Sequence, residues 1–156
     1  MKSYIFIKKS DLPTLPENFN SDGRFAPQLV QKLIERYSKE GDSIFDPFLG
    51  YGTTVYIAEI LNRVGYGIEL DRERFNYSVS ICKNVNNILC DDLMNIPTSL
   101  LPEMDVCITS PTYAWRNMGC NPFNLYMGKD SYEQYLNTMV CFFKKIVQFM
   151  KNDSYT

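Results

Sequence analysis

The stretch DPFLGYGTT, residues 46–54, constrains the fold more than any other part of this chain. It follows the short apolar run 43–45 and precedes residues 54–61, in which apolar side chains recur at helical spacing. The stretch therefore predicts a strand-to-helix turn, with glycine where the backbone must bend or be approached closely. Turns of this kind form ligand crevices at the carboxyl ends of strands in α/β sheets.

The rest of the chain alternates between predicted strands and predicted helices. Pro27 is suited to the first position of a helix, and Gly41 and Asp42 end that helix. We expect strands over 43–45, 63–70, 87–90 and 104–109, and helices over 54–61, 72–83 and 131–150. Residues 3–8 resemble a short strand or a packed arm. This order predicts an α/β fold with a mainly parallel sheet.

Composition excludes several kinds of chemistry. The chain has 156 residues, enough for one domain with a substantial core, and it is 45% hydrophobic. No apolar run is long enough to span a bilayer and no signal peptide is visible, so we expect a cytoplasmic protein without a membrane partner. Five scattered cysteines and no histidine argue against a metal site and against Ser-His-Asp or Cys-His catalysis. Any catalysis must need little proton shuttling.

Three predicted strands end in an acid, at Asp46, Glu69 and Asp91. In a doubly wound sheet these residues lie along one rim, where a nucleoside could contact all three and Glu69 could accept hydrogen bonds from ribose hydroxyls. The turn lacks the spacing of a dinucleotide site and the lysine of a P-loop. Asp46 would repel a pyrophosphate but attract an ammonium group. The favoured ligand is therefore a nucleoside that carries an amino acid, S-adenosylmethionine.

DPFLGYGTT, followed by GYGIELDRERF and by CITSPTYAW, resembles the amino-group DNA methyltransferases, which act on cytosine N4 or adenine N6. RFAPQLVQKLI, ahead of the turn, is similar to the segment that flanks the cofactor in this family, so that the resemblance covers residues 24–116. It implies a Rossmann-like class I methyltransferase core with helices on both faces of the sheet. It also implies a site-specific DNA methyltransferase of a restriction–modification system, with duplex DNA as its partner and the target base flipped out.

The resemblance also assigns site residues. For the cofactor it implies Phe25, Asp46, Pro47, Phe48, Gly50, Gly52, Thr53, Glu69, Leu70 and Asp91. For catalysis it implies Ser110, Pro111 and Tyr113. The Ser110 hydroxyl and the Pro111 carbonyl would accept hydrogen bonds from the target amine, and Tyr113 would stack on the extruded base. Trp115 and Arg116 are further candidates for nucleic-acid contact, although packing or solvent exposure explains them equally well.

Two features depart from the family pattern. Thr112 stands where the family has a second proline, which removes a ring that stiffens the loop. The chain also stops where a fifth strand would begin, so we expect an N-terminal arm and loop over 1–23 and a partial core over 24–156 that lacks the C-terminal strands. The fourth strand would then be an open sheet edge, covered by residues 3–8 or by a partner. A separate specificity domain or a second copy is a candidate for that partner.

Two other functions remain open from the sequence. One is methylation of RNA, for instance at guanine N2 of tRNA, against which Ser110 and the sequence GIEL argue mildly. The other is a truncated or degenerate module that binds cofactor or a partner without turnover, which Thr112 and the early stop favour. The net charge of −2 gives no sign of a domain that grips duplex DNA unaided.

Overall fold

The computed structural model describes residues 7–8, 11–19, 24–114 and 132–156. The helices are α1 (Pro27–Tyr37), α2 (Thr53–Ile60), α3 (Arg72–Ile81) and α5 (Tyr132–Val147), and two 3-10 turns are η3 (Val85–Asn87) and η4 (Thr98–Leu100). The strands are β1 (Ser43–Asp46), β2 (Val64–Glu69), β3 (Ile88–Cys90), β4 (Met104–Cys107) and β5 (Met150–Tyr155). Pro27 occupies the start of α1, as the sequence predicts.

The five strands form one parallel sheet in the order β3-β2-β1-β4-β5. The chain moves outward from β1 through β2 to β3, and then crosses back to pair β4 with the other side of β1. The carboxyl ends of β1 and β4 therefore diverge at a topological switch point, where α/β sheets form their ligand crevices.

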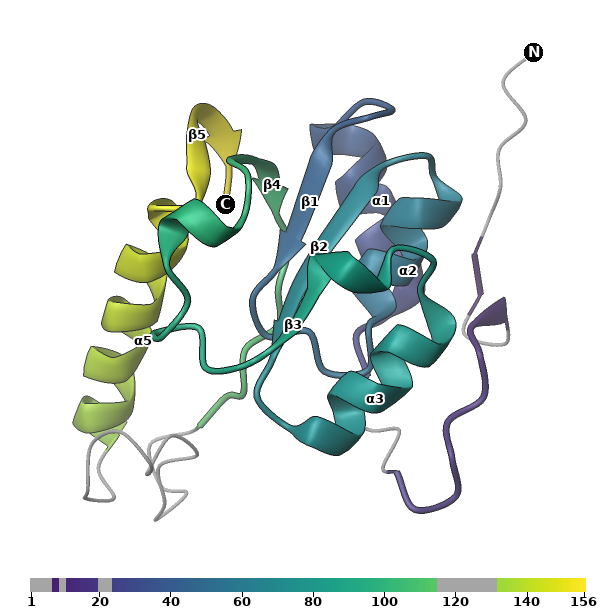
Figure 1. Ribbon diagram of the computed structural model, residues 1–156, viewed down its shortest axis with the longest axis horizontal. Helices are drawn as coiled ribbons and strands as arrows, with labels where there is room; N and C mark the ends of the chain where they lie inside the picture. The colour runs from purple at the N-terminus through teal and green to yellow at the C-terminus, as the bar shows by residue number, and fades with distance from the viewer. Residues whose placement is uncertain (1–6, 9–10, 20–23, 115–131) are drawn as a thin grey trace.

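Helices cover both faces of the sheet, as expected (Figure 1). Consecutive residues of β1 point to opposite sides: Ile44 packs with α1 and α2, whereas Phe45 packs with α5. Both side chains are fully buried. This alternation builds one apolar layer on each face of the sheet and fixes the strand ends at its rim.

The expectation that the sheet lacks a fifth strand and leaves β4 as an open edge is wrong. Residues 150–155 form β5, which pairs parallel with β4. Met104 N donates to Phe149 O at 2.8 Å, and Lys151 Nζ binds Asp105 Oδ1 at 2.6 Å. Helix α5 ends at Val147, three residues before its predicted end, and this leaves the chain free to turn into the strand.

The described part of the N-terminal segment packs beside α1 rather than on the sheet edge. Ile7 is buried in the layer of α1 and α2, and its backbone amide donates to Gln31 Oε1 at 2.8 Å. Residues 1–6, and with them most of the predicted strand over 3–8, lie outside the described residues, as do Trp115 and Arg116. No helix among the described residues is long and apolar enough to cross a membrane.

Candidate active site

A cavity of about 700 Å³ opens at the carboxyl ends of β1 to β4. It takes its walls from the turn after β1, the end of β2, the start of α3, the loop after β3 and the loop after β4. The lining residues are Arg24, Phe25, Asp46–Tyr51, Thr53, Thr54, Ile68–Arg72, Arg74, Asp91–Leu93, Ser110–Tyr113 and Phe142. Every residue assigned to the site from the sequence lines this cavity except Gly52.

The glycine turn has the backbone geometry that its sequence predicts. Gly50 and Gly52 adopt φ angles of 57° and 75°, in the left-handed region that favours glycine. A Cβ on Gly52 would lie 3.1 Å from the side chain of Ser78 on α3, and the Ser78 hydroxyl donates to Gly50 O at 3.0 Å. Gly52 thus supports the cavity wall from behind and allows α3 to approach closely.

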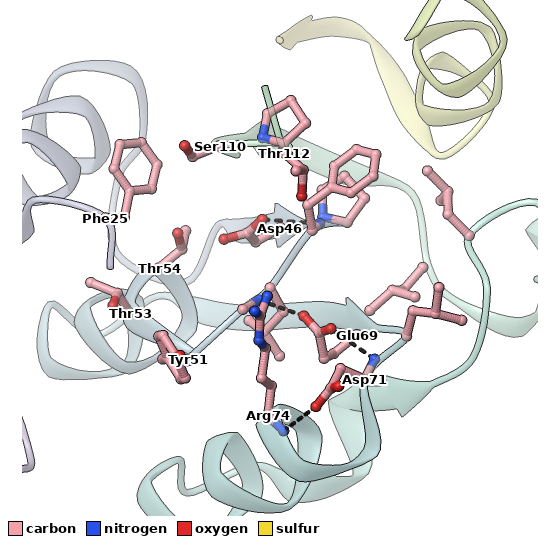
Figure 2. Close-up of a pocket in the computed structure, with 18 of the residues that line it drawn as sticks. Phe25, Asp46, Tyr51, Thr53, Thr54, Glu69, Asp71, Arg74, Ser110 and Thr112 are labelled. Carbon is pink, nitrogen blue, oxygen red and sulfur yellow. Dashed lines mark hydrogen bonds between the residues drawn. The ribbon is translucent and has the colours of Figure 1, made fainter. Parts of the chain in front are cut away.

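The Glu69 carboxylate is held in place by two backbone amides. Gly50 N donates to Oε2 at 2.6 Å, and Asp71 N donates to Oε1 at 2.8 Å (Figure 2). A carboxylate accepts about four hydrogen bonds, so both oxygens keep capacity for a ligand's hydroxyl groups. Burial raises the pKa of Glu69, and the two amides and Arg74 oppose that rise.

Asp46 is a buried carboxylate at the tip of β1, with 2% of its surface exposed. Burial raises its pKa to about 6, although hydrogen bonds from Thr109 Oγ1 (2.7 Å) and Phe48 N (3.2 Å) favour the ionised form. At neutral pH the group is therefore mostly ionised in a poorly solvated place. Such a carboxylate attracts a cationic ligand group.

The third acid-ended strand and two apolar residues complete the walls around these carboxylates. Asp91 follows β3, is exposed, and accepts a hydrogen bond from Asp92 N at 2.7 Å. Leu70 is 54% exposed at the end of β2, and Phe25 lines the cavity from the segment before α1. The exposed Leu70 and the half-buried Phe25 line the same cavity as the acids, which suits a ligand with both a flat ring and polar groups.

The SPTY segment follows β4 and faces the same cavity. Ser110 and Tyr113 are exposed, and Tyr113 has 68% of its surface accessible. The Tyr135 hydroxyl on α5 donates to Thr112 O at 3.2 Å, so a contact from α5 restrains the loop at the position that lacks the second proline.

Sequence reasoning missed several residues that line the cavity. Arg74 lies with its guanidinium carbon 5.5 Å from the centre of the Tyr51 ring, and Phe142, assigned to the core from its helical spacing, stacks edge-on against Phe48 at 5.1 Å. Arg24 and Thr54 also face the cavity. Arg24 precedes Phe25 in the segment before α1 that resembles the family. Its position next to Phe25 is the only sequence feature that could have indicated that Arg24 lines the cavity.

The arrangement agrees with what comparison with known proteins shows. A family model described as DNA methylase, covering the N6 and N4 enzymes, matches residues 10–80. Over this stretch, which is less than half of the chain, the sequence is similar to the amino-group DNA methyltransferases. The matched segment contains the glycine turn and Glu69 and ends before the SPTY segment.

Individual relatives match over similar stretches. The chain is 36% identical over 66 residues to the orphan methyltransferase M.BamHII of Bacillus amyloliquefaciens, a match that covers 42% of this chain and 25% of the relative. It is 39% identical over 70 residues to the type II methyltransferase M.MjaI of Methanocaldococcus jannaschii, covering 45% of this chain and 23% of the relative. The chain thus spans about a quarter of the length of these curated relatives.

A solved structure supports the fold. The chain is similar to a TehB-like S-adenosylmethionine-dependent methyltransferase of Corynebacterium glutamicum, with a TM-score of 0.51 and 18% identity, over 80% of this chain and 58% of that one. The fold is therefore that of the Rossmann-like methyltransferases, as the sequence predicts.

Proposed function

We propose that this chain is the catalytic core of a methyltransferase that transfers a methyl group to the exocyclic amine of a DNA base, cytosine N4 or adenine N6. One observation carries the proposal: Ser110, Pro111 and Tyr113 line the same cavity as Asp46, Glu69 and Asp91. Groups suited to an acceptor amine and groups suited to a nucleoside cofactor thus line the same open cavity. The match to a family model described as DNA methylase supports DNA as the substrate, and we propose a role in restriction and modification.

The residues present fit S-adenosylmethionine as the cofactor. Glu69, fixed by two backbone amides, suits the ribose hydroxyls, Asp91 the adenine edge, and Leu70 the adenine face. Asp46, buried and mostly ionised, would hold the ammonium group. Pro47, Phe48, Gly50 and Thr53 would line the amino-acid end, with Phe25 contributed by the segment before α1. When bound, the cofactor supplies a methyl group that its sulfonium has already made electrophilic.

The chain's own residues then have to make the exocyclic amine, a poor nucleophile, more reactive. The lone pair of an exocyclic amine is delocalised into the base ring. The Ser110 hydroxyl and the Pro111 carbonyl, as acceptors for the two amine hydrogens, draw the nitrogen toward tetrahedral geometry and free its lone pair for attack. The exposed ring of Tyr113 stacks on the base, a contact worth roughly 1–3 kcal/mol. A base inside a duplex cannot reach this cavity, so the reaction requires it to be flipped out.

Substitution of Ser110 tests the division of roles. Ser110→Ala removes one acceptor for the amine but no contact to the cofactor. We expect methyl transfer to fall at least about a hundredfold, while affinity for S-adenosylhomocysteine stays within a few-fold. Transfer of tritiated methyl from S-adenosylmethionine to duplex DNA, together with calorimetry, measures both quantities.

The controls separate this function from its rivals. Glu69→Ala should weaken cofactor binding first, and equal losses of binding and transfer in both variants would contradict the roles assigned here. Bulk tRNA replaces DNA in a parallel assay, and methylation of tRNA alone would point to an RNA substrate. Folded protein that binds no S-adenosylhomocysteine would leave only a non-catalytic partner-binding module.

A further inference from the structure

The SPTY segment, residues 110–113, is attached to the core just before it and just after it. Thr109 Oγ1 donates to Asp46 Oδ1 at 2.7 Å, and Ala114 packs against the apolar layer between the sheet and α5. Between these two points Thr112 is exposed at the edge of the cavity (Figure 2). The segment is therefore a short stretch of backbone at the cavity edge that is held at both ends.

Tyr135 on α5 provides a hydrogen bond to the middle of this segment. Its hydroxyl donates to Thr112 O at 3.2 Å, and its side chain is buried, with 8% of its surface exposed. The ring belongs to the same apolar layer and stacks on Tyr132, with the two ring centres 5.9 Å apart. A ring that is packed in a dense core keeps its hydroxyl in one place. Tyr135 is thus a fixed donor for a carbonyl of an exposed residue.

The same helix also contacts the wall formed by the turn after β1. Phe142, about two turns along α5 from Tyr135, lines the cavity and stacks edge-on against Phe48 of that turn. One helix therefore contacts both the turn that carries proposed cofactor residues and the segment that carries the proposed acceptors for the amine. Contacts from α5 help to set the distance between these two parts of the cavity.

The backbone angles of Thr112 decide how the Pro111 carbonyl is aimed. The peptide that carries this carbonyl and the next peptide, which carries Thr112 O, meet at the α-carbon of Thr112 and rotate relative to each other only through its φ and ψ angles. A proline at this position, as in the family pattern, would fix φ at about −65°. Threonine does not, so the hydrogen bond from Tyr135, which holds the second of the two peptides, removes part of the same freedom.

We propose that Tyr135 is a positioning residue for methyl transfer, which holds the SPTY segment through Thr112 O in the shape that a second proline would otherwise impose. This inference rests on the proposed function, in which the Ser110 hydroxyl and the Pro111 carbonyl accept the hydrogens of the target amine. Tyr135 does not line the cavity, so it acts on the reaction through the segment. The effect falls on the rate of transfer, because a small displacement of an acceptor from its productive position slows a reaction strongly.

A double-mutant cycle between Tyr135 and Thr112 tests this role. Tyr135→Phe removes the hydroxyl and keeps the ring, and should lower the rate of methyl transfer at saturating cofactor about threefold to tenfold, the range for one hydrogen bond. Thr112→Pro stiffens the segment by another means, so in that background the same Tyr135→Phe change should alter the rate by less than about twofold. The assay uses tritiated S-adenosylmethionine and bacterial genomic DNA that has been amplified in vitro and is therefore unmethylated.

Controls separate positioning from a general loss of structure. Affinity of Tyr135→Phe for S-adenosylhomocysteine in calorimetry should stay within about twofold of the unaltered protein, because the change lies outside the cavity. Tyr132→Phe removes a hydroxyl from the stacked neighbour on the same helix and leaves the hydrogen bond to Thr112 O in place, so it should transfer methyl at the unaltered rate. Thermal unfolding monitored by circular dichroism checks that each variant folds.

The outcomes that overturn the role of Tyr135 differ from those that overturn the proposed function. An unchanged rate in Tyr135→Phe, equal losses in both backgrounds, or a loss of rate matched by an equal loss of cofactor affinity would each show that Tyr135 does not position the segment. An inactive Thr112→Pro would contradict the claim that proline supports the same shape. In these cases the unaltered protein still transfers methyl, and the proposed function stands. If the folded, unaltered protein transfers no methyl to DNA, the proposed function falls, and the role of Tyr135 falls with it.

Discussion

Asp46 and Glu69 show how single carboxylates can be placed for different tasks by their surroundings. Burial raises the pKa of both carboxyl groups, and hydrogen bonds oppose the rise in both. Asp46, which is more deeply buried, still reaches a pKa of about 6, whereas Arg74 also opposes the rise at Glu69. With a pKa of about 6, Asp46 therefore titrates just below neutral pH. Its charge state controls what the cavity attracts.

Cofactor affinity should depend on pH through Asp46. Below pH 6 the Asp46 carboxyl is mostly protonated in the free protein and must release its proton before it can bind an ammonium group. We expect affinity for S-adenosylhomocysteine to fall toward tenfold per pH unit below about pH 6 and to level off above pH 7. Calorimetry between pH 5 and 8 measures this, and Asp46→Asn should give a nearly flat profile; a flat profile in the unaltered protein would contradict the role of Asp46.

The same titration has an effect of opposite sign on folding. Because the pKa of Asp46 in the folded protein lies above its ordinary value of 3.8, the folded state binds the proton more tightly than the unfolded state. The contribution of Asp46 to stability is therefore fully present below about pH 4 and is lost as the pH rises through about 6. Burial of this charge is a local cost at neutral pH that a cationic ligand can offset.

At the scale of elements, the turn between β1 and α2 depends on glycine for two reasons, backbone conformation and close packing against α3. Comparison with Gly41, which lies before β1, separates the two. Gly52 has a φ angle of 75° and lies against Ser78, whereas Gly41 has a φ angle of 88° and has no atom within 4 Å of the position a Cβ would take. Both positions disfavour a side chain because of backbone conformation. Only Gly52 adds a steric conflict.

Alanine at the two glycines should therefore have different effects. Gly41→Ala should lower the free energy of unfolding by about 1–2 kcal/mol, the cost of a left-handed conformation with a Cβ. Gly52→Ala should cost more than that and also weaken S-adenosylhomocysteine binding, because α3 must move away from the turn. Urea unfolding and calorimetry measure the two effects, and equal destabilisation with unchanged binding would contradict the support that Gly52 gives to the cavity.

The helices and the first four strands could be predicted because their apolar residues follow the periods of a helix or of a buried strand. The fifth strand could not, because MKNDSY is polar and exposed at four of its six positions and carries no alternating pattern. The apolar stripe of α5 also extends through Phe149 and Met150, which conceals where the helix ends. Arg24 and Arg74 were missed because their place in the cavity depends on contacts between segments far apart in the chain.

At the scale of the whole molecule, the net charge of the chain and the share of its relatives' length that it covers affect how tightly it could bind DNA. The chain carries a net charge of −2 and spans about a quarter of its curated relatives. Acidic groups at Asp46, Glu69 and Asp91 face the cavity, where they suit a cofactor but repel a phosphate backbone. We expect this chain by itself to make few of the phosphate contacts that hold duplex DNA.

Duplex DNA should therefore bind this chain weakly. We expect a dissociation constant above about 10 µM at physiological salt and a shallow dependence on salt concentration, since few phosphates are neutralised. Fluorescence anisotropy with a labelled duplex at several salt concentrations measures both. A submicromolar dissociation constant with a steep salt dependence would contradict this expectation and show that this chain alone binds the DNA phosphate backbone.

The two backbone amides that hold Glu69 have a kinetic consequence. Because the amides of Gly50 and Asp71 both donate to this carboxylate, the turn after β1 and the start of α3 are joined by the chain's own hydrogen bonds and need no ligand to connect them. Ligand capture then needs little rearrangement of the backbone. Association should be a single fast phase whose observed rate rises linearly with ligand concentration, without the plateau that a slow reshaping step would impose.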